Sequence, residues 1–220
     1  MEREDLNLYA CMLREYLMEV GMGETWAAVL NMVLNTLIVA VLATFLDIVF
    51  RKIVVQLFKA FSDKTTTTFD DFLVKSNFPR FIAHFLPLSI VWYLIPSLFQ
   101  DFPNIEMGMY KIAQLYLVLL CVLVFRSILR TTNNYLNFSK EKYSDKPLES
   151  YVQVLMIFAW GVAIFFFVNI LTGYNIKSLA TLGAASAVIL LIFKDTILGF
   201  VASIQVSVND IVRIGDWITF

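Results

Sequence analysis

Few side chains in this 220-residue chain are suited to chemistry, and they form no catalytic or metal-binding pattern. The single histidine is His84, while Cys11 stands in a polar stretch and Cys121 in an apolar run. Neither cysteine has another cysteine or a histidine at metal-ligand spacing, which favours two structural thiols over a disulfide framework or a zinc site. The sequence contains no nucleophile–base pair, no H-E-x-x-H motif and no glycine-rich phosphate loop. It therefore predicts a protein that is not an enzyme and that uses no cofactor or metal.

Four other groups with possible chemistry lie near the ends of apolar runs or in a polar loop. A membrane carrier usually has ionisable residues at mid-depth, broken helices or internal repeats. Asp47 and His84 are both close to predicted interfaces, and the chain shows no internal repeat. We therefore favour a packing or interfacial role for His84 over a proton relay. Asp70 and Asp71 follow a threonine run without a partner cluster, which favours a solvated hairpin over a phosphate or metal site.

The composition indicates an integral membrane protein. Apolar residues make up 59% of the chain and charged residues 16%, with a mean hydropathy of +0.73. A soluble domain carries about a quarter charged residues. The net charge of -1 gives no sign of nucleic-acid binding. The first residues are acidic, unlike the basic start of a signal peptide, so the first apolar run should remain as an anchor.

Five apolar runs are long enough to cross a hydrocarbon core of about 30 Å, which takes about 20 helical residues. Backbone polar groups find no other partners in lipid, so each run should be a helix. Pro87 and Pro96 should bend the second run. The five runs are Trp26–Leu46, Phe81–Phe99, Tyr110–Leu129, Tyr151–Leu171 and Ile176–Phe193.

The distribution of lysine and arginine predicts how the helices cross the membrane. When basic residues near the ends of a run are counted with the adjoining connection, the segments before, between and after the runs carry 2, 6, 1, 5, 1 and 2 basic residues in chain order. Basic loops remain on the cytoplasmic side, so the N-terminus should be outside and the chain should end inside. The expected fold is an all-α membrane protein with five spans. Before the first span, Leu6–Val20 reads as an amphipathic helix, either on the outer membrane surface or loosely held.

The fifth run differs from the others because it opens with small residues. Small side chains let helix backbones approach closely in lipid. Such a face suits packing against copies of the same chain, the lining of a narrow pore, or an ordinary contact inside one bundle, and the helix alone does not decide among them. At 100° per residue one stripe holds Ala180, Ala184, Ala187 and Leu191, with Gly183 and Val188 on its flanks.

The adjacent charges Lys194 and Asp195 follow this run. A lysine is favoured at a helix C-terminus, and an aspartate can cap the start of a new helix. We therefore predict that one helix ends here and that a second, amphipathic helix begins along the inner membrane surface. Gly199 and Ser203, four residues apart, would form a close-packing pair on that second helix. The alternative is one continuous helix.

The order of these elements resembles the mechanosensitive channel of small conductance (MscS) family. The resemblance rests on Leu182–Ile218, with its strings "LGAAS", "FKDTILGFVASIQ" and "VNDIVRIGDWI". The second string, followed by "ND" and "GDW", is most similar to the five-helix, YbdG-like miniconductance branch. The match covers about the last forty residues, whereas the first four helices agree only in number and topology.

The resemblance implies a homo-heptamer in the bacterial inner membrane that conducts ions under membrane tension and protects against hypo-osmotic shock. It places Ala187 and Leu191 at the hydrophobic constriction, Gly183 at a helix contact, and Lys194–Asp195 at the kink of the pore helix. Val188 and Leu190 are larger than the family's usual residues, and Asp195 replaces a flexible glycine. We therefore expect the chain to divide into four units. They are a periplasmic N-terminal amphipathic helix (1–25), a four-helix membrane-sensing paddle (26–171), the pore and sub-membrane helices (172–209) and the start of a cytoplasmic β-domain (210–220).

Membrane lipids are the other expected partners. Basic side chains at the inner helix ends can hold anionic headgroups, although a role in topology alone is equally compatible with their positions. A non-conducting sensory or structural ring, or less readily a carrier, would fit the same sequence. The basic residues are Arg51, Lys52, Arg126 and Arg130.

Overall fold

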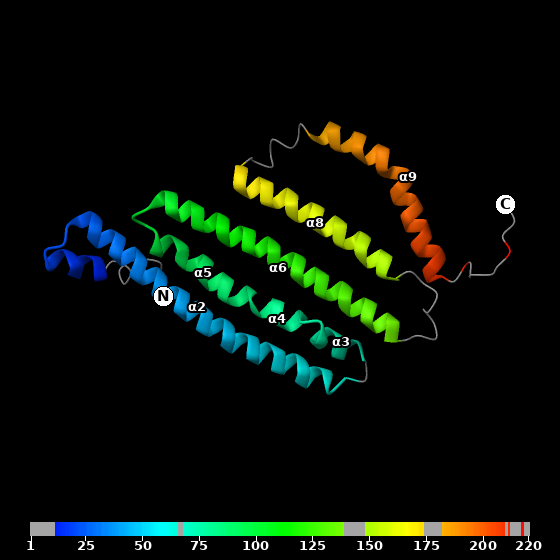
Figure 1. The fold of residues 1–220 in the computed structure, drawn as a ribbon, viewed down its shortest axis with the longest axis horizontal. Helices are drawn as coiled ribbons and strands as arrows, with labels where there is room; N and C mark the ends of the chain where they lie inside the picture. Colours follow the sequence, from blue (N-terminus) through cyan, green and yellow to red (C-terminus); the bar gives the residue numbers. More distant parts are fainter. Residues whose placement is uncertain are drawn as a thin grey trace.

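The computed structural model describes residues 12–65, 68–138, 148–173 and 182–209, together with Ile211 and Trp217. The regular structure of this part is entirely α-helical, without strands. The long helices lie roughly alongside one another in a single row that runs α2, α5, α6, α8 and α9 (Figure 1). Their bounds are α2 Glu24–Ser62, α3 Phe69–Lys75, α4 Phe78–Ala83, α5 Phe85–Leu98, α6 Pro103–Phe138, α8 Leu148–Thr172 and α9 Leu182–Val208.

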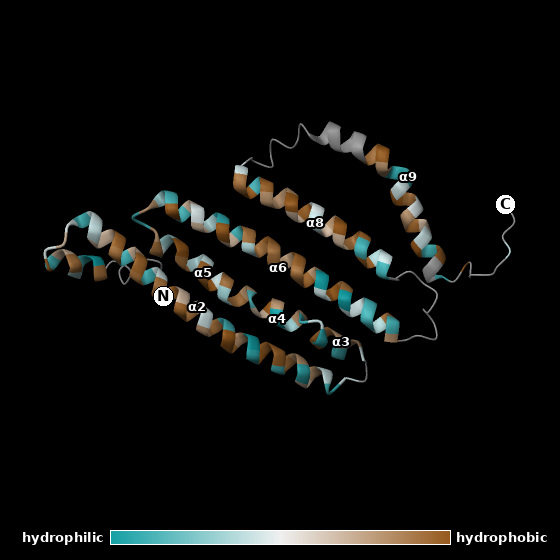
Figure 2. Cartoon of the chain, viewed as in Figure 1, coloured by the Kyte–Doolittle hydropathy of each residue, from teal (hydrophilic) through white to brown (hydrophobic). Residues whose placement is uncertain are grey.

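Four stretches of helix are long and apolar enough to cross a membrane, which confirms a multi-pass membrane protein. They are Glu24–Ser62, Phe78–Leu98, Pro103–Phe138 and Glu149–Thr172. Apolar residues predominate along all four (Figure 2). The fifth span stays a prediction, because residues 174–181 lie outside the described part. The sidedness of the chain and the β-domain at 210–220 also stay predictions.

The second span is interrupted, as its prolines predicted. α4 ends at Ala83, His84 forms the joint, and α5 begins at Phe85. Pro87 explains the position of this joint, since a proline removes the hydrogen bond to the carbonyl four residues earlier and clashes with it. That carbonyl belongs to Ala83. Pro96 does not interrupt α5, which ends two residues later.

Both α2 and α6 continue well beyond the apolar runs that predicted them. α2 passes the expected end at Leu46 and reaches Ser62, and α6 passes Leu129 and reaches Phe138. No glycine or proline lies in either extension. The extension of α2 contains lysine, arginine, leucine and glutamine, which are good helix formers, whereas that of α6 is mostly threonine, asparagine and aromatic residues, which are weaker ones. The change from apolar to more polar residues therefore does not end either helix.

The solvated hairpin predicted between the first two spans is instead a short helix, α3, attached to the end of α2. Ser62 Oγ donates to Asp71 Oδ1 at 2.5 Å, and Thr65 Oγ1 donates to Asp70 Oδ2 at 2.6 Å. Both acids lie in the first turn of α3, where negative charge is favourable. The two acids thus fasten α3 to the end of α2.

Buried residues at the α5–α6 interface join these helices to α2. Ile95 of α5 and Phe99, the residue just after that helix, pack with Ala113 of α6, and Met32 of α2 lies against this cluster. The rings of Trp92 and Tyr110 meet edge-on, with their centroids 5.7 Å apart. This cluster holds the relative positions of three of the membrane helices.

Replacing Ile95 with alanine should lower the thermal stability of the protein in detergent. Ile95 is 1% exposed, and truncation of such a residue costs about 2–5 kcal/mol through lost packing. Leu86→Ala on the same helix is the matched control, because Leu86 is 42% exposed. Equal melting temperatures for the two variants would contradict the packing of this interface.

Candidate functional site

α9, which carries most of the predicted pore residues, is a single α-helix from Leu182 to Val208. The predicted helix break at Lys194–Asp195 is therefore wrong, and Asp195 does not cap a new helix. Neither residue forces the backbone out of helical geometry, and no proline occurs in this stretch. The ribbon nevertheless changes direction near its middle, at the hydrophilic band (Figure 2). The functional role proposed for a kink here stays a prediction.

The middle of α9 is uncovered on all sides by the described part of the chain. Leu190, Leu191, Ile192 and Phe193 are successive residues, about 100° apart, and they are 63%, 74%, 68% and 52% exposed. α9 contacts α8 through the rings of Phe200 on α9 and Tyr151 on α8, which meet edge-on with their centroids 6.1 Å apart. The described part of the chain therefore leaves the apolar circumference of α9 open at residues 190–193.

The predicted small-residue stripe lies only partly within the described side chains. Gly183, Ala184, Ala187 and Val188 have helical backbone in α9, but their side chains lie outside the described part, as does the whole of Ala180. Further along the helix, Lys194, Asp195 and Ser203 are exposed, and a Cβ added at Gly199 would meet nothing within 4 Å. The Gly199–Ser203 face is thus not packed against the described chain.

The four basic residues predicted at helix ends lie inside helices instead. Arg51 and Lys52 precede the end of α2 by about three turns, and Arg126 and Arg130 precede the end of α6 by two or three. Lys52, Arg126 and Arg130 are exposed, whereas Arg51 places Nη2 3.6 Å from Asp47 Oδ2. Three of the four therefore have side chains open to the surroundings.

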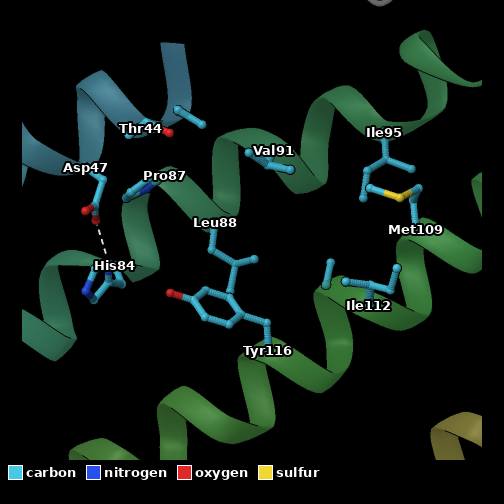
Figure 3. Close-up of a pocket in the computed structure, with 12 residues that line it drawn as sticks. Thr44, Asp47, His84, Pro87, Leu88, Val91, Ile95, Met109, Ile112 and Tyr116 are labelled. Atoms are coloured by element: carbon cyan, nitrogen blue, oxygen red, sulfur yellow. Dashed lines mark ion pairs between the residues drawn. The ribbon is translucent and has the colours of Figure 1, made fainter. Parts of the chain in front are cut away.

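The structure brings together Asp47 and His84, which the sequence analysis assigned separately to interfaces. His84 Nδ1 lies 2.5 Å from Asp47 Oδ1, so the joint between α4 and α5 touches α2 (Figure 3). The aromatic ring of Tyr116 on α6 comes close to the same region. No sequence pattern indicated that Asp47 and His84, 37 residues apart, would meet.

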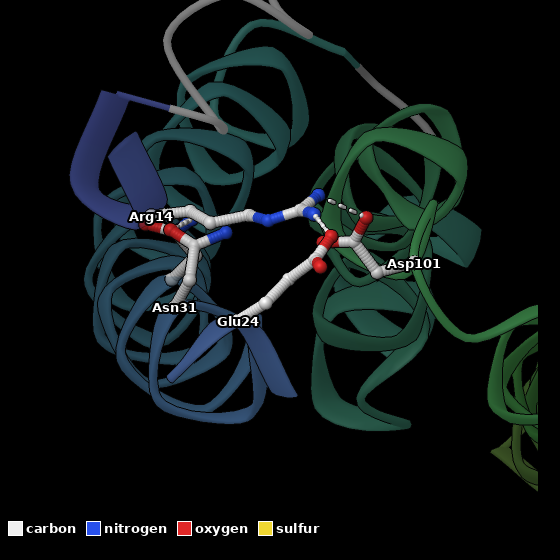
Figure 4. Close-up of polar contacts among 5 residues, drawn as sticks. Arg14, Glu24, Asn31 and Asp101 are labelled. Atoms are coloured by element: carbon white, nitrogen blue, oxygen red, sulfur yellow. Dashed lines mark hydrogen bonds and ion pairs between the residues drawn. The ribbon is translucent and has the colours of Figure 1, made fainter. Parts of the chain in front are cut away.

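A second polar cluster, at the N-terminal end of α2, was not anticipated from the sequence. Arg14 belongs to the N-terminal helical segment, residues 12–19, and its guanidinium reaches two carboxylates (Figure 4). Nη1 donates to Asp101 Oδ1 at 2.7 Å and Nη2 donates to Glu24 Oε1 at 2.9 Å. Asp101 lies between α5 and α6, so Arg14 ties the N-terminal segment to the ends of three helices.

Removing Asp101 should destabilise this cluster measurably. The side chains of Arg14 and Asp101 are 23% and 24% exposed, so the pair is intermediate between a surface and a buried ion pair. We expect Asp101→Ala to cost about 1–3 kcal/mol of stability. Glu24→Ala should cost less, because Glu24 is 76% exposed. Proteolysis of the N-terminal segment measures the effect, and equal cleavage rates for both variants and the parent would contradict the assignment.

The described residues contain no group of three histidine, cysteine or acidic side chains placed to hold a metal ion. Cys121 is a free, exposed thiol, whereas Cys11 lies outside the described part. No family model matches this chain, and no solved structure matches it.

Proposed function

We propose that this chain is the membrane part of an ion channel opened by membrane tension, in which α9 from several copies lines the central pore. The observation that carries the proposal is the middle of α9, which the described part of the chain leaves uncovered. Successive apolar residues 190–193 are more than half exposed, while α2, α5 and α6 share buried contacts. A ring of copies, which the sequence resemblance suggests is a heptamer in the bacterial inner membrane, would cover this helix on two sides and leave a third facing the axis.

In the closed state, apolar side chains at Ala187 and Leu191 would close the pore by excluding water, as hydrophobic constrictions do. These two residues are four apart on one continuous helix, so they fall on the same face. Small residues Gly183 and Ala184 at the preceding turn suit close approach between neighbouring copies. Gly199 and Ser203, one to two turns beyond the bend, offer a second surface for such packing.

Tension favours the conformation that occupies the larger area in the plane of the membrane, as a ligand favours the state that it binds more tightly. The four helices α2, α5, α6 and α8 would transmit this effect from lipid to α9. Lys52, Arg126 and Arg130, which are exposed on α2 and α6, are suited to hold anionic headgroups. Protection against hypo-osmotic shock would follow from release of ions through the open pore.

Patch recording tests the proposal directly. The protein reconstituted alone in liposomes should conduct under suction and stay silent at rest, and its mass in nanodiscs should correspond to a closed ring. A tension-evoked current absent from the reconstituted protein, or a monomer in lipid, contradicts the proposal. A ring without current would favour the non-conducting sensory assembly, while saturable solute uptake would favour a carrier.

A further inference from the structure

A cavity of about 380 Å³ lies between α2, α5 and α6, within the membrane-spanning part of the helices. Its walls are largely apolar and include Leu88, Val91, Ile112 and Ala113 (Figure 3). Ligand sites in proteins occupy about 300–1,000 Å³ and combine apolar walls with a few polar groups. An apolar cavity of about 150 Å³ already takes up benzene, so this one has room for an aromatic ring with an alkyl chain.

One end of the cavity is polar. Asp47 is the acidic residue in the lining, with Thr44, His84 and Tyr116 near it. His84 Nδ1 lies 2.5 Å from the buried Asp47 Oδ1, but the described residues donate no hydrogen bond to this oxygen, so part of the carboxylate's capacity of about four lone pairs is unused. Arg51 Nη2 stands 3.6 Å from Oδ2, whereas a charge-assisted hydrogen bond is about 2.7–2.9 Å long. Asp47 therefore retains an acceptor that a cationic donor can use.

We infer that this cavity binds a small amphipathic primary amine, whose ammonium group pairs with Asp47 and whose apolar body lies along α5 and α6. An ammonium group has three N–H donors, and hydroxyl oxygens can accept those that Asp47 does not take. Thr44 Oγ1 donates its own proton to Ala40 O at 2.8 Å, so its lone pairs remain available. The Tyr116 hydroxyl points toward the His84 side of the cavity (Figure 3).

The charge of Asp47 also decides against other amphiphiles of the same shape. A carboxylate ligand would bring like charge to Asp47, and a neutral alcohol would offer only one donor and no cationic charge. A buried ion needs a paired charge and hydrogen bonds. The ammonium group donates hydrogen bonds to Asp47, and the two opposite charges pair with each other. The inference concerns the paddle helices alone and does not depend on ion conduction.

Titration calorimetry of the full chain in phosphatidylcholine nanodiscs tests this site with 4-phenylbutylamine. Empty nanodiscs correct for partition into lipid, and 4-phenylbutanol and 4-phenylbutyrate are the matched ligands. We expect saturable binding of one amine per chain, weaker binding of the alcohol and none of the carboxylate. Binding that does not saturate, or equal affinity for amine and carboxylate, would overturn the proposal.

Variants separate the roles of charge and volume. Asp47→Asn should weaken amine binding roughly ten- to a hundredfold, to the level of the alcohol. Val91→Phe and Ala43→Leu fill the cavity from two different helices, and each should abolish binding of both ligands. Leu86→Phe, at an exposed position on α5, should leave binding unchanged.

Three results would overturn the proposal. Unchanged amine affinity in Asp47→Asn would show that no ion pair forms. Unchanged affinity in both Val91→Phe and Ala43→Leu would show that the amine binds elsewhere. Loss of amine binding when the nanodiscs contain phosphatidylethanolamine would assign the ammonium position to a lipid headgroup rather than to a free amine.

Discussion

Replacing Leu191 with serine should produce a channel that opens at much lower tension and that slows the growth of cells expressing it. Leu191 lies on the face of α9 shared with Ala187, and it is 74% exposed in the single chain. Burying a leucine is worth about 1.5–3 kcal/mol, and every copy in the proposed ring would contribute this to its closed state. A hydroxyl at the constriction also lets water wet the pore. The threshold suction in patches of liposomes measures the change.

The matched control for this variant is Leu190→Ser, one residue earlier on the same helix. Leu190 is also exposed, at 63%, but its side chain points about 100° away from the constriction. It should change the threshold much less. Ala187→Val should act in the opposite direction, because it narrows the constriction and makes it more apolar. Equal effects of Leu190→Ser and Leu191→Ser would mean that the pore face has been assigned wrongly.

Neutralising the two charges of α9 should move the ion preference of the pore in opposite directions. Because the helix is continuous, Lys194 and Asp195 lie three and four residues beyond Leu191 and therefore on the same side of the helix. Rings of charged side chains near a constriction select ions by sign. We expect Asp195→Asn to raise the permeability to anions relative to cations, and Lys194→Gln to lower it.

Reversal potentials under a salt gradient give the result for these two variants. Gln205→Glu, at an exposed position further along α9, serves as a control for the mere addition of charge. It should have a smaller effect than either neutralisation. Reversal potentials that stay at the parental value in both Asp195→Asn and Lys194→Gln would place these charges away from the ion path.

The sequence predicted the four long apolar helices and the interruption in the second, because these depend on local properties. About 20 apolar residues specify a crossing, and Pro87 specifies which carbonyl loses its hydrogen bond. The lengths of α2 and α6 were predicted wrongly for a physical reason. Hydropathy reports where a helix leaves lipid, whereas a helix ends only where the backbone finds a better conformation or a cap. Neither extension contains such a signal.

The predicted break at Lys194–Asp195 was wrong for a related reason. Asp195 is well suited to cap a helix, but a cap has an effect only if the preceding backbone departs from helical geometry. Aspartate inside a helix costs only a fraction of a kcal/mol more than a good helix former, so continuity is the cheaper outcome. The side chains of Lys194 and Asp195 are compatible with both a capped break and a continuous helix, so they do not determine the backbone conformation here.

The polar contacts between the helices could not be derived from single-sequence patterns. Arg14 and Asp101 are 87 residues apart, and Asp47 and His84 are 37 apart. Their meeting depends on which helices are neighbours and on their rotation about their own axes. Hydrophobic periodicity does not determine that rotation here, since the membrane helices are apolar on nearly every side. The His84–Asp47 contact and the cavity beside it therefore appear only in three dimensions.

The length of α2 has a consequence for bilayer thickness. Its 39 residues make a rod about 58 Å long, and the exposed Ile53, Leu57 and Phe61 form an apolar stripe on its far end. If the whole rod stays within a bilayer of about 40–45 Å including headgroups, it must tilt by about 40°. Thinning the bilayer by about 4 Å would then increase the tilt and lengthen the rod's projection on the membrane plane from about 38 to about 42 Å. A stretched membrane becomes thinner, so a rod held entirely within the bilayer in this way would convert a change of thickness into lateral expansion.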